Sequence, residues 1–154
     1  MSDNQDIVIR TMLVSDYDQV ARLWTSISGF AIRSLDDSRE GISRFLQRNP
    51  STSVVAEKDG EIVGTILCGH DGRQACFYHV CVKKEYRMQG IGTRMAQAAT
   101  QALATEKINK AYLIAFKKNE AGNAFWKSVG WDFRDDRNYY EFVLNKENQI
   151  TFND

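Results

Sequence analysis

One short stretch of the sequence suits anion binding by its residue types and spacing. Residues 87–92 read Arg-Met-Gln-Gly-Ile-Gly, after an apolar strand-like run and before an alanine-rich helix-like one. Without Cβ atoms, Gly90 and Gly92 let a ligand approach the backbone, and the first amides of the next helix have no partner within it. A phosphate group is the expected ligand of this stretch. A plain turn that uses glycine only for its backbone freedom fits the same residues.

The run before this loop, residues 75–82, contains groups that can move a proton. Tyr78 and His79 stand side by side there, and histidine titrates near neutral pH. Strict strand alternation turns His79 away from the face of Tyr78 unless a bulge intervenes. A buried structural histidine is the alternative.

The elements that position these residues follow from hydrophobic periodicity and turn signals. Residues 28–35 show no period and read as a loop, and Asp-Gly pairs at 59–60 and 71–72 mark tight turns. Strands are expected at 7–10, 53–57, 61–68, 75–82, 111–116, 131–134 and 139–144, and helices at 15–27, 36–49, 91–103 and 119–129. The order β-α-α-β-β-β-α-β-α-β-β predicts an α+β fold, a mixed, mostly antiparallel six- to seven-stranded sheet with helices on both faces.

Composition sets the limits on domain number and partners. The chain has 154 residues, 43% hydrophobic and 26% charged, which predicts a single domain over 1–154 with 145–154 as a loose tail. Lys+Arg and Asp+Glu each total 20, so we expect no nucleic-acid partner and no membrane association. Without a signal or spanning segment, a cytoplasmic protein is expected.

The three cysteines predict buried apolar positions in a reducing compartment. Cys68, Cys76 and Cys81 lie within strand-like runs and lack C-x-x-C spacing. No metal site is expected.

Two common glycine-loop folds do not fit residues 87–92. A dinucleotide fold places its loop after the first strand and has a third glycine where this chain has Met95. A triphosphate-binding P-loop ends in Gly-Lys-Ser or Gly-Lys-Thr, whereas this loop continues as Gly92-Thr93-Arg94.

The spacing Arg87-x-x-Gly90-x-Gly92 resembles the acetyl-CoA loop of the GNAT superfamily of N-acetyltransferases, Gln/Arg-x-x-Gly-x-Gly/Ala. Asn119, seven residues before Trp126, and the pair Gly130-Trp131 are similar to a second signature of that family, an asparagine-headed helix that ends in a Gly-aromatic pair. The resemblance covers nearly the whole chain. Residues 69–73 and 125–126 are also similar to a bacterial subgroup of small acetyltransferases.

The resemblance implies acetyl-CoA as cosubstrate and an amine acceptor of unknown identity. The pyrophosphate would be held by the backbone amides of the loop, those of Met88, Gln89, Gly90, Ile91, Gly92 and Thr93. Arg87 would add charge or brace the loop, unless it is merely solvated. If the parallel strands splay, the backbone of Val80, Cys81 and Val82 would bond the pantetheine arm. Asn119 would reach that arm or only cap its helix.

The same resemblance leaves the acid and base open. The family often has a tyrosine acid where Trp126 stands, and indole has no usable acid pKa. Trp126 would then pack on the pantetheine or acyl arm, or belong to the core. The candidates for the acid are then Tyr78, Tyr139 and Tyr140. The candidates for the base are His79, or a chain of water molecules that leads to bulk solvent or to Asp71 or Glu57.

Three functions follow from these residues. The first is an acetyl-CoA-dependent N-acetyltransferase that moves an acetyl group to a primary amine by direct attack on the thioester. The second is a non-catalytic acyl-CoA-binding or sensing protein, and the third is a nucleotide-binding module. Exposed sheet edges also make a homodimer an expectation.

Overall fold

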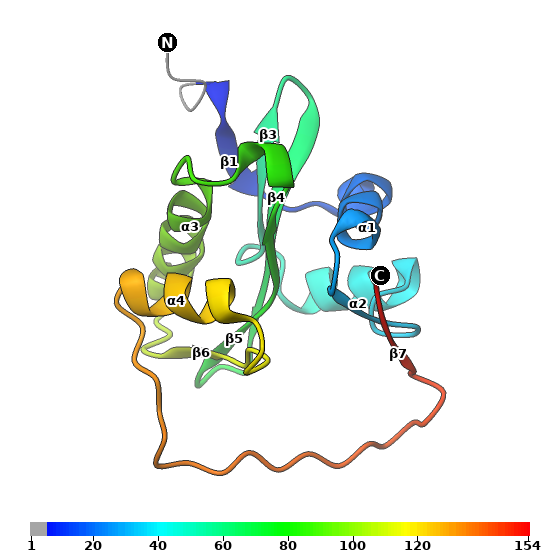
Figure 1. Cartoon of the computed structure of the whole chain (residues 1–154), viewed down its shortest axis with the longest axis vertical. Helices are drawn as coiled ribbons and strands as arrows, with labels where there is room; N and C mark the ends of the chain where they lie inside the picture. The colour runs from blue at the N-terminus through cyan, green and yellow to red at the C-terminus, as the bar shows by residue number, and fades with distance from the viewer. Residues whose placement is uncertain (1–5) are drawn as a thin grey trace.

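A computed structural model describes residues 6–154 and contains a five-stranded main sheet (Figure 1). The strand order is β1-β3-β4-β5-β6, antiparallel throughout except for the parallel pair β5–β6. Their bounds are β1 Val8–Thr11, β3 Val54–Lys58, β4 Glu61–His70, β5 Ala75–Val82 and β6 Ala111–Leu113. The predicted mixed, mostly antiparallel sheet is confirmed, with fewer strands than the six or seven expected.

Helices cover both faces of this sheet, as predicted. Figure 1 shows α1 and α2 on one face and α3 and α4 on the other. Their bounds are α1 Tyr17–Ser26, α2 Arg39–Arg48, α3 Ile91–Thr105 and α4 Glu120–Ser128. Each face has its own apolar core, to which α1 contributes Val20 and Trp24 and α3 contributes Met95 and Ala99. No helix within residues 6–154 is long and apolar enough to cross a membrane.

The β3–β4 hairpin turns where the sequence predicts it. Asp59 and Gly60 both have positive φ, 52° and 81°. This is the backbone of a type I′ turn, whose twist matches the strands that it joins.

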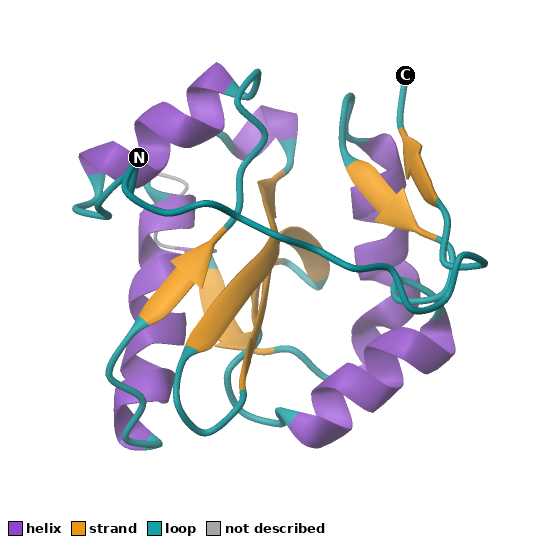
Figure 2. Ribbon diagram, turned by 90° about the horizontal axis from the view of Figure 1, so that it is seen from below, coloured by secondary structure: helices purple, strands orange, loops and turns teal. Residues whose placement is uncertain are grey.

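The predicted last two strands are wrong. Residues 132–149 form no strand. They run from the end of α4 to β7 as a single extended segment outside the main sheet and its helices (Figures 1 and 2). Strand-forming side chains are present there, but the segment pairs with no strand of residues 6–154, and a strand needs a paired neighbour to form.

Two segments without a predicted element form a second, small sheet. β2, Ala31–Arg33, pairs antiparallel with β7, Ile150–Phe152. The expected loop at 28–35 and the expected loose tail at 145–154 are therefore corrected. Asn153 fixes the tail further, because its Nδ2 donates to the carbonyls of Trp24 at 2.7 Å and Ile27 at 2.9 Å.

Candidate functional site

The glycine loop connects β5 to α3 and presents free helix amides. Gly90 is the N-cap of α3 in the left-handed region, with φ 80°. Arg94 N–H donates to the Gly90 carbonyl at 3.0 Å, so the helix ladder begins there and the amides of residues 91–93 precede it. A Cβ on Gly90 would meet nothing within 4 Å, so the space beside it is open. This arrangement suits a phosphate or pyrophosphate.

Gly92 has a different role from Gly90. A Cβ on Gly92 would lie 3.2 Å from the Phe125 ring of α4. Its missing side chain lets α4 pack against α3, and the sequence interpretation of both glycines as ligand contacts did not foresee this.

The arginines beside the loop are braces. Arg87 donates from Nε to the Val82 carbonyl at 2.9 Å and so ties the loop to the end of β5. Arg94 donates from Nη2 to the Ile7 carbonyl at 2.9 Å. This bond fits the bracing alternative for Arg87, and a contact of its terminal nitrogens with a ligand stays a prediction.

β5 loses its regular pairing in the middle of its length. Its parallel partner β6 pairs only with Ala75, Cys76 and Phe77, although β5 continues to Val82. On the other side the register with β4 shifts between Thr65 and Leu67, which places two residues of β5 opposite Ile66. The backbone around Val80 is therefore where an extended ligand can bond to β5, as the pantetheine arm is predicted to do.

The shift is a β-bulge, and it turns His79 onto the face of Tyr78. His79 has φ 48°, a left-handed conformation that non-glycine residues seldom adopt. Its carbonyl accepts a bond from Thr65 Oγ1 at 2.8 Å, and Thr65 in turn accepts from Trp24 Nε1 at 3.0 Å. The buried Trp24–Thr65 pair thus holds the bulge in place.

The His79 side chain is held by a buried carboxylate. Nε2 lies 2.7 Å from Asp37 Oδ1, and the two side chains are 13% and 6% exposed. Asp37 Oδ2 accepts from the Arg33 amide at 2.6 Å. Because a carboxylate only accepts, Nε2 donates in this contact, and in the neutral imidazole Nδ1 is then the acceptor nitrogen.

Aromatic rings fix the plane of this imidazole. The His79 ring lies 4.7 Å from the Trp24 ring and 5.0 Å from the Phe30 ring, centroid to centroid. One imidazole nitrogen is thus bonded to a carboxylate, and the described residues 6–154 give the other no hydrogen bond. An imidazole held in this way has the chemistry that a general base needs.

Tyr78 directly precedes His79 in the chain. Its ring meets Phe45 edge-on at 5.9 Å. Burial raises the pKa of Tyr78, so its hydroxyl stays protonated and can donate a hydrogen bond. The other two tyrosines considered as acids, Tyr139 and Tyr140, lie on the external segment and are 64% and 87% exposed.

The carboxylates named as alternative bases have structural partners. Glu57 Oε2 pairs with Arg10 Nη2 at 2.7 Å on β3. Asp71 accepts from the amides of Arg73 and Gln74 in the β4–β5 turn, and these bonds lower its pKa. Neither group contacts His79.

Helix α4 has the caps that its sequence signature predicts. Asn119 Oδ1 accepts from the Gly122 amide at 3.0 Å, which makes Asn119 the N-cap. Gly130 has φ 95°, and its amide and that of Trp131 close a Schellman motif on Lys127 and Trp126. A contact of Asn119 with pantetheine stays a prediction.

Trp126 lies in the core. It is 9% exposed, and its ring lies 5.9 Å from that of Phe77 and 4.7 Å from that of Trp131. Of the two alternatives for Trp126, membership of the core describes its packing. A contact with a bound pantetheine or acyl arm stays a prediction and would involve only the small exposed part of the side chain. Cys81 is likewise buried, 3.3 Å from Thr65 Oγ1 through its sulfur, so only its backbone is placed to bind a ligand.

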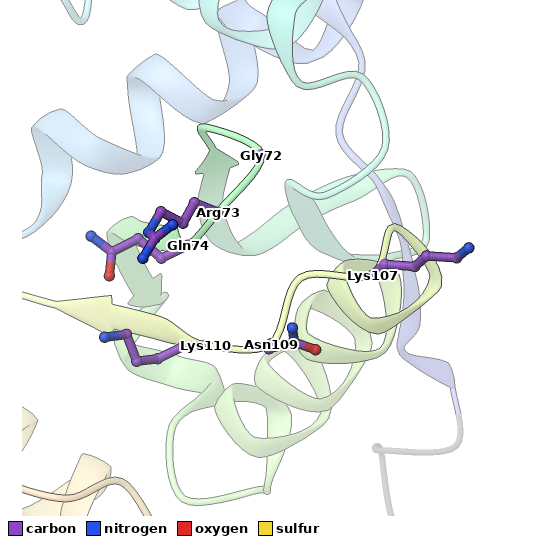
Figure 3. Close-up of a pocket in the computed structure, with 6 residues that line it drawn as sticks. All are labelled: Gly72, Arg73, Gln74, Lys107, Asn109 and Lys110. Carbon is purple, nitrogen blue, oxygen red and sulfur yellow. The ribbon is translucent and has the colours of Figure 1, made fainter.

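One surface cavity lies away from these groups. A cavity of about 380 Å³ is lined by Gly72, Arg73, Gln74, Lys107, Asn109 and Lys110, beyond the end of α3 opposite the glycine loop (Figure 3). In Figure 3 Lys107 points away from Arg73 and Lys110, so the cations do not converge on one ligand. Within residues 6–154 no three His, Cys, Asp or Glu side chains gather as a metal site would require.

A mixed sheet whose two parallel strands part beside a helix-heading glycine loop defines the acyl-CoA N-acyltransferase class of fold. Residues 17–131 match the Acetyltransferase (GNAT) family, and the chain belongs to this family of acyltransferase enzymes.

The relatives agree with this assignment. Acetyltransferase SG1711 of Sodalis glossinidius is 28% identical over 127 residues, 82% of this chain and 88% of the relative. Among solved structures, the PaiA N-acetyltransferase of Thermoplasma acidophilum in complex with coenzyme A superposes with a TM-score of 0.74 at 18% identity, over 85% of this chain and 92% of that one. An aminoglycoside acetyltransferase from a soil metagenome, in complex with sisomicin, gives 0.70 at 18% identity over 92% and 99%. At these identities the structures show the fold alone.

Sequence reasoning missed Asp37. It lies 42 residues before His79, in a stretch with no motif and next to another aspartate. Only the fold brings the two together, and an unassigned aspartate before a helix reads first as a cap.

Proposed function

We propose that the chain catalyses acetyl transfer from acetyl-CoA to a primary amine, with His79 as the general base. The observation that supports this most is the bulge of β5, which places an oriented imidazole at the point where β5 and β6 part. The loop amides at the start of α3 follow a few residues further along the same connection.

The chain's residues fit each part of acetyl-CoA. The amides of residues 88–93 would hold the pyrophosphate, with Arg87 bracing the loop. Backbone groups of Val80, Cys81 and Val82 would bond the pantetheine amides as a strand does. When bound, acetyl-CoA supplies an activated acetyl group as a thioester.

His79 then takes the proton that the attacking amine must lose. Nδ1 accepts it while Asp37 holds Nε2–H and stabilises the imidazolium that forms. A new C–N bond forms, the C–S bond breaks, and the electron pair leaves on sulfur. Tyr78 can donate a hydrogen bond to that sulfur, and a thiol of pKa about 8.5 leaves tolerably without a full proton transfer.

A backbone amide of the bulged strand would stabilise the carbonyl oxygen as charge develops on it. Val80, like His79, has no regular pairing partner on either side of β5. These assignments are supported by position in the fold.

A second function is favoured by one observation. Trp126 stands at the family's usual tyrosine position and is buried, so this chain has no acid there. A protein that binds acyl-CoA and senses it without turnover has the same fold and loop. A cytoplasmic location, the single domain and the absence of a nucleic-acid partner remain predictions from the sequence.

An amine panel separates the two functions. The purified chain is incubated with acetyl-CoA and an amino acid, a polyamine, an aminoglycoside or a peptide with a free N-terminus, and free thiol and acetylated product are measured. The panel spans these classes because similar structures include the aminoglycoside acetyltransferase named above. Product with any amine supports the enzyme. Thermal stabilisation by acetyl-CoA without product across the panel supports the sensor, and stabilisation by a dinucleotide or triphosphate in place of CoA would contradict both.

A further inference from the structure

The small sheet of β2 and β7 stands apart from the main sheet and has two different faces (Figure 2). Residues that pair directly across an antiparallel ladder share a face, and so do residues two apart along a strand. Arg33 pairs with Ile150 and Ala31 pairs with Phe152, so these four side chains lie on one face. Ile32 points to the other face, where it packs against the core of α1 and α2.

The face that carries Arg33 is turned toward the chain that follows β6. The Phe152 ring lies 5.5 Å from the Phe116 ring, centroid to centroid, and Lys118 Nζ lies 5.4 Å from the centroid of the Phe152 ring. Phe116 and Lys118 come directly after β6, whose pairing with β5 ends two residues before His79. Arg33 thus lies on the side of the small sheet that faces the parting of β5 and β6.

The main chain of Arg33 is bonded to the carboxylate that holds the proposed base. The Arg33 amide donates to Asp37 Oδ2 at 2.6 Å, and Asp37 Oδ1 lies 2.7 Å from His79 Nε2. The Arg33 carbonyl also accepts from the Asp37 amide at 3.1 Å. One carboxylate fixes both the imidazole and the start of the Arg33 side chain, so a single small molecule can reach both groups.

The guanidinium of Arg33 has no hydrogen bond or ion pair with residues 6–154, although Arg33 is only partly exposed. The two carboxylates that follow it in the chain are engaged elsewhere. Asp37 holds His79, and Asp36 Oδ2 accepts from Asn148 Nδ2 at 2.8 Å. A guanidinium offers donors only, and its planar shape matches a carboxylate, which it can bind through two parallel hydrogen bonds.

The electrostatics of two tyrosines agree with this position of Arg33. A hydrogen bond with Glu141 raises the pKa of Tyr139, and the Arg33 cation opposes that rise. Burial raises the pKa of Tyr78, and Tyr139 adds to this effect. Arg33 is therefore within electrostatic range of Tyr139, which is itself within range of Tyr78, the neighbour of His79.

The surroundings of Arg33 on this face are apolar and cationic. Ile150, Phe152 and Phe116 are 43%, 44% and 47% exposed, so they offer apolar surface to a ligand. The positive charges of Arg33 and Lys118 repel a polyamine or an aminoglycoside, which carries several positive charges, and attract a carboxylate.

We infer that the acceptor is an amino acid with an apolar side chain, whose carboxylate binds the Arg33 guanidinium while its amine faces His79. This assignment rests on the proposed acetyl transfer. It gives Arg33 the selection of the acceptor and no part in the proton transfer. The apolar side chain of the amino acid packs against Phe116 and Phe152.

Paired substrates test this inference. Phenylalanine and phenylalaninamide share the amine and the ring, but the amide lacks the negative charge. At equal concentrations of free amine, the wild-type KM for phenylalanine should be about ten- to a hundredfold lower than that for phenylalaninamide, because only phenylalanine forms charge-assisted hydrogen bonds. Leucine and leucinamide provide a second pair with an aliphatic side chain.

Two variants of Arg33 and one control separate selection from a structural role. Arg33→Gln should raise the KM for phenylalanine about ten- to a hundredfold and leave kcat/KM for phenylalaninamide unchanged, so the preference disappears. Arg33→Lys keeps the charge without the planar fork and should restore part of the preference. Arg39→Gln is the matched control, because Arg39 lies at the start of α2 and pairs with Asp18, and it should keep the wild-type preference.

The outcomes distinguish this inference from the proposed function. Equal kcat/KM for each amino acid and its amide in wild type, or a preference that survives in Arg33→Gln, would overturn the inference and leave acetyl transfer in place. If no amine gives product, the proposed function fails, and binding decides the inference. Saturation-transfer NMR should then detect phenylalanine on the wild-type protein with coenzyme A and not on Arg33→Gln, and equal signals or none from the two proteins would overturn it.

Discussion

Replacing Asp37 by Asn separates the orientation of His79 from the presence of its imidazole. Asn has the shape of Asp, but only one of its two terminal atoms accepts hydrogen bonds. Asp37 accepts from His79 Nε2 at 2.7 Å and from the Arg33 amide at 2.6 Å, so one of these donors must face an NH₂ group in Asp37→Asn.

The size of the effect follows from these contacts. One unsatisfied buried donor costs about 1–3 kcal/mol of folding free energy, which a thermal melt detects. An oriented general base contributes about 10²–10⁴ in rate, so we expect Asp37→Asn to lower kcat about a hundredfold, with the KM for acetyl-CoA unchanged. A hundredfold slower turnover corresponds to a loss of about 2.7 kcal/mol of transition-state stabilisation.

The assay is steady-state thiol release at saturating acetyl-CoA with the best amine of the panel. His79→Gln and the double variant complete a cycle, and because the two residues act as a unit, the double variant should be no slower than His79→Gln. ¹⁵N NMR of the imidazole should show Nε2–H in the wild type and a mixture of tautomers in Asp37→Asn. A wild-type turnover rate in Asp37→Asn, or losses that multiply in the double variant, would refute the pairing.

Four further predictions concern the surroundings of the site. Gly41→Ala should lower both Tm and kcat, because its Cβ would lie 2.3 Å from the Leu35 carbonyl oxygen in the turn before α2 that holds Asp37; unchanged melting would contradict the crowding. Asn119→Ala should cost about 1 kcal/mol of stability as a lost N-cap, while Asn119→Asp keeps the cap, so a KM for acetyl-CoA that rises in both variants would identify a pantetheine contact, and an unchanged KM in Asn119→Asp would contradict one. Arg87→Ala should weaken coenzyme A binding by about tenfold in calorimetry, since it removes one charge-assisted brace, and an unchanged Kd would show that this brace does not contribute to coenzyme A binding. Burial raises the pKa of the Cys81 thiol to about 11 and that of Cys68 to about 12, so native protein at neutral pH should resist iodoacetamide at both until it is unfolded; fast alkylation of either would be incompatible with the packing.

Local signals predicted the parts of the fold that local chemistry determines. The Asp59-Gly60 turn, the N-cap Asn119 and the C′ glycine Gly130 all appear where the sequence places them, because each depends on the backbone of a few neighbouring residues.

Non-local pairing decided the rest. Residues 139–144 have strand-forming side chains but no strand beside them, whereas β2 and β7 have little pattern and pair across the whole chain. The site also has a part that depends on local sequence and a part that depends on non-local contacts. The loop at 87–92 follows from its motif, while the bulge at His79 depends on its register with Thr65, and the Asp37 contact depends on a loop that the helices α1 and α2 position.

Single-turnover transfer by His79→Gln, compared with His70→Gln, tests the central claim most directly. His70, at the end of β4, is the other histidine of the chain. Its Nε2 lies 2.9 Å from Glu106 Oε1, away from Asp37. With acetyl-CoA prebound and amine added, we expect His79→Gln to form acetylated amine about 10²–10⁴ times more slowly than wild type at an equal Kd for acetyl-CoA, and His70→Gln to match the wild-type rate. Equal rates in wild type and His79→Gln would contradict the assignment of His79 as the base.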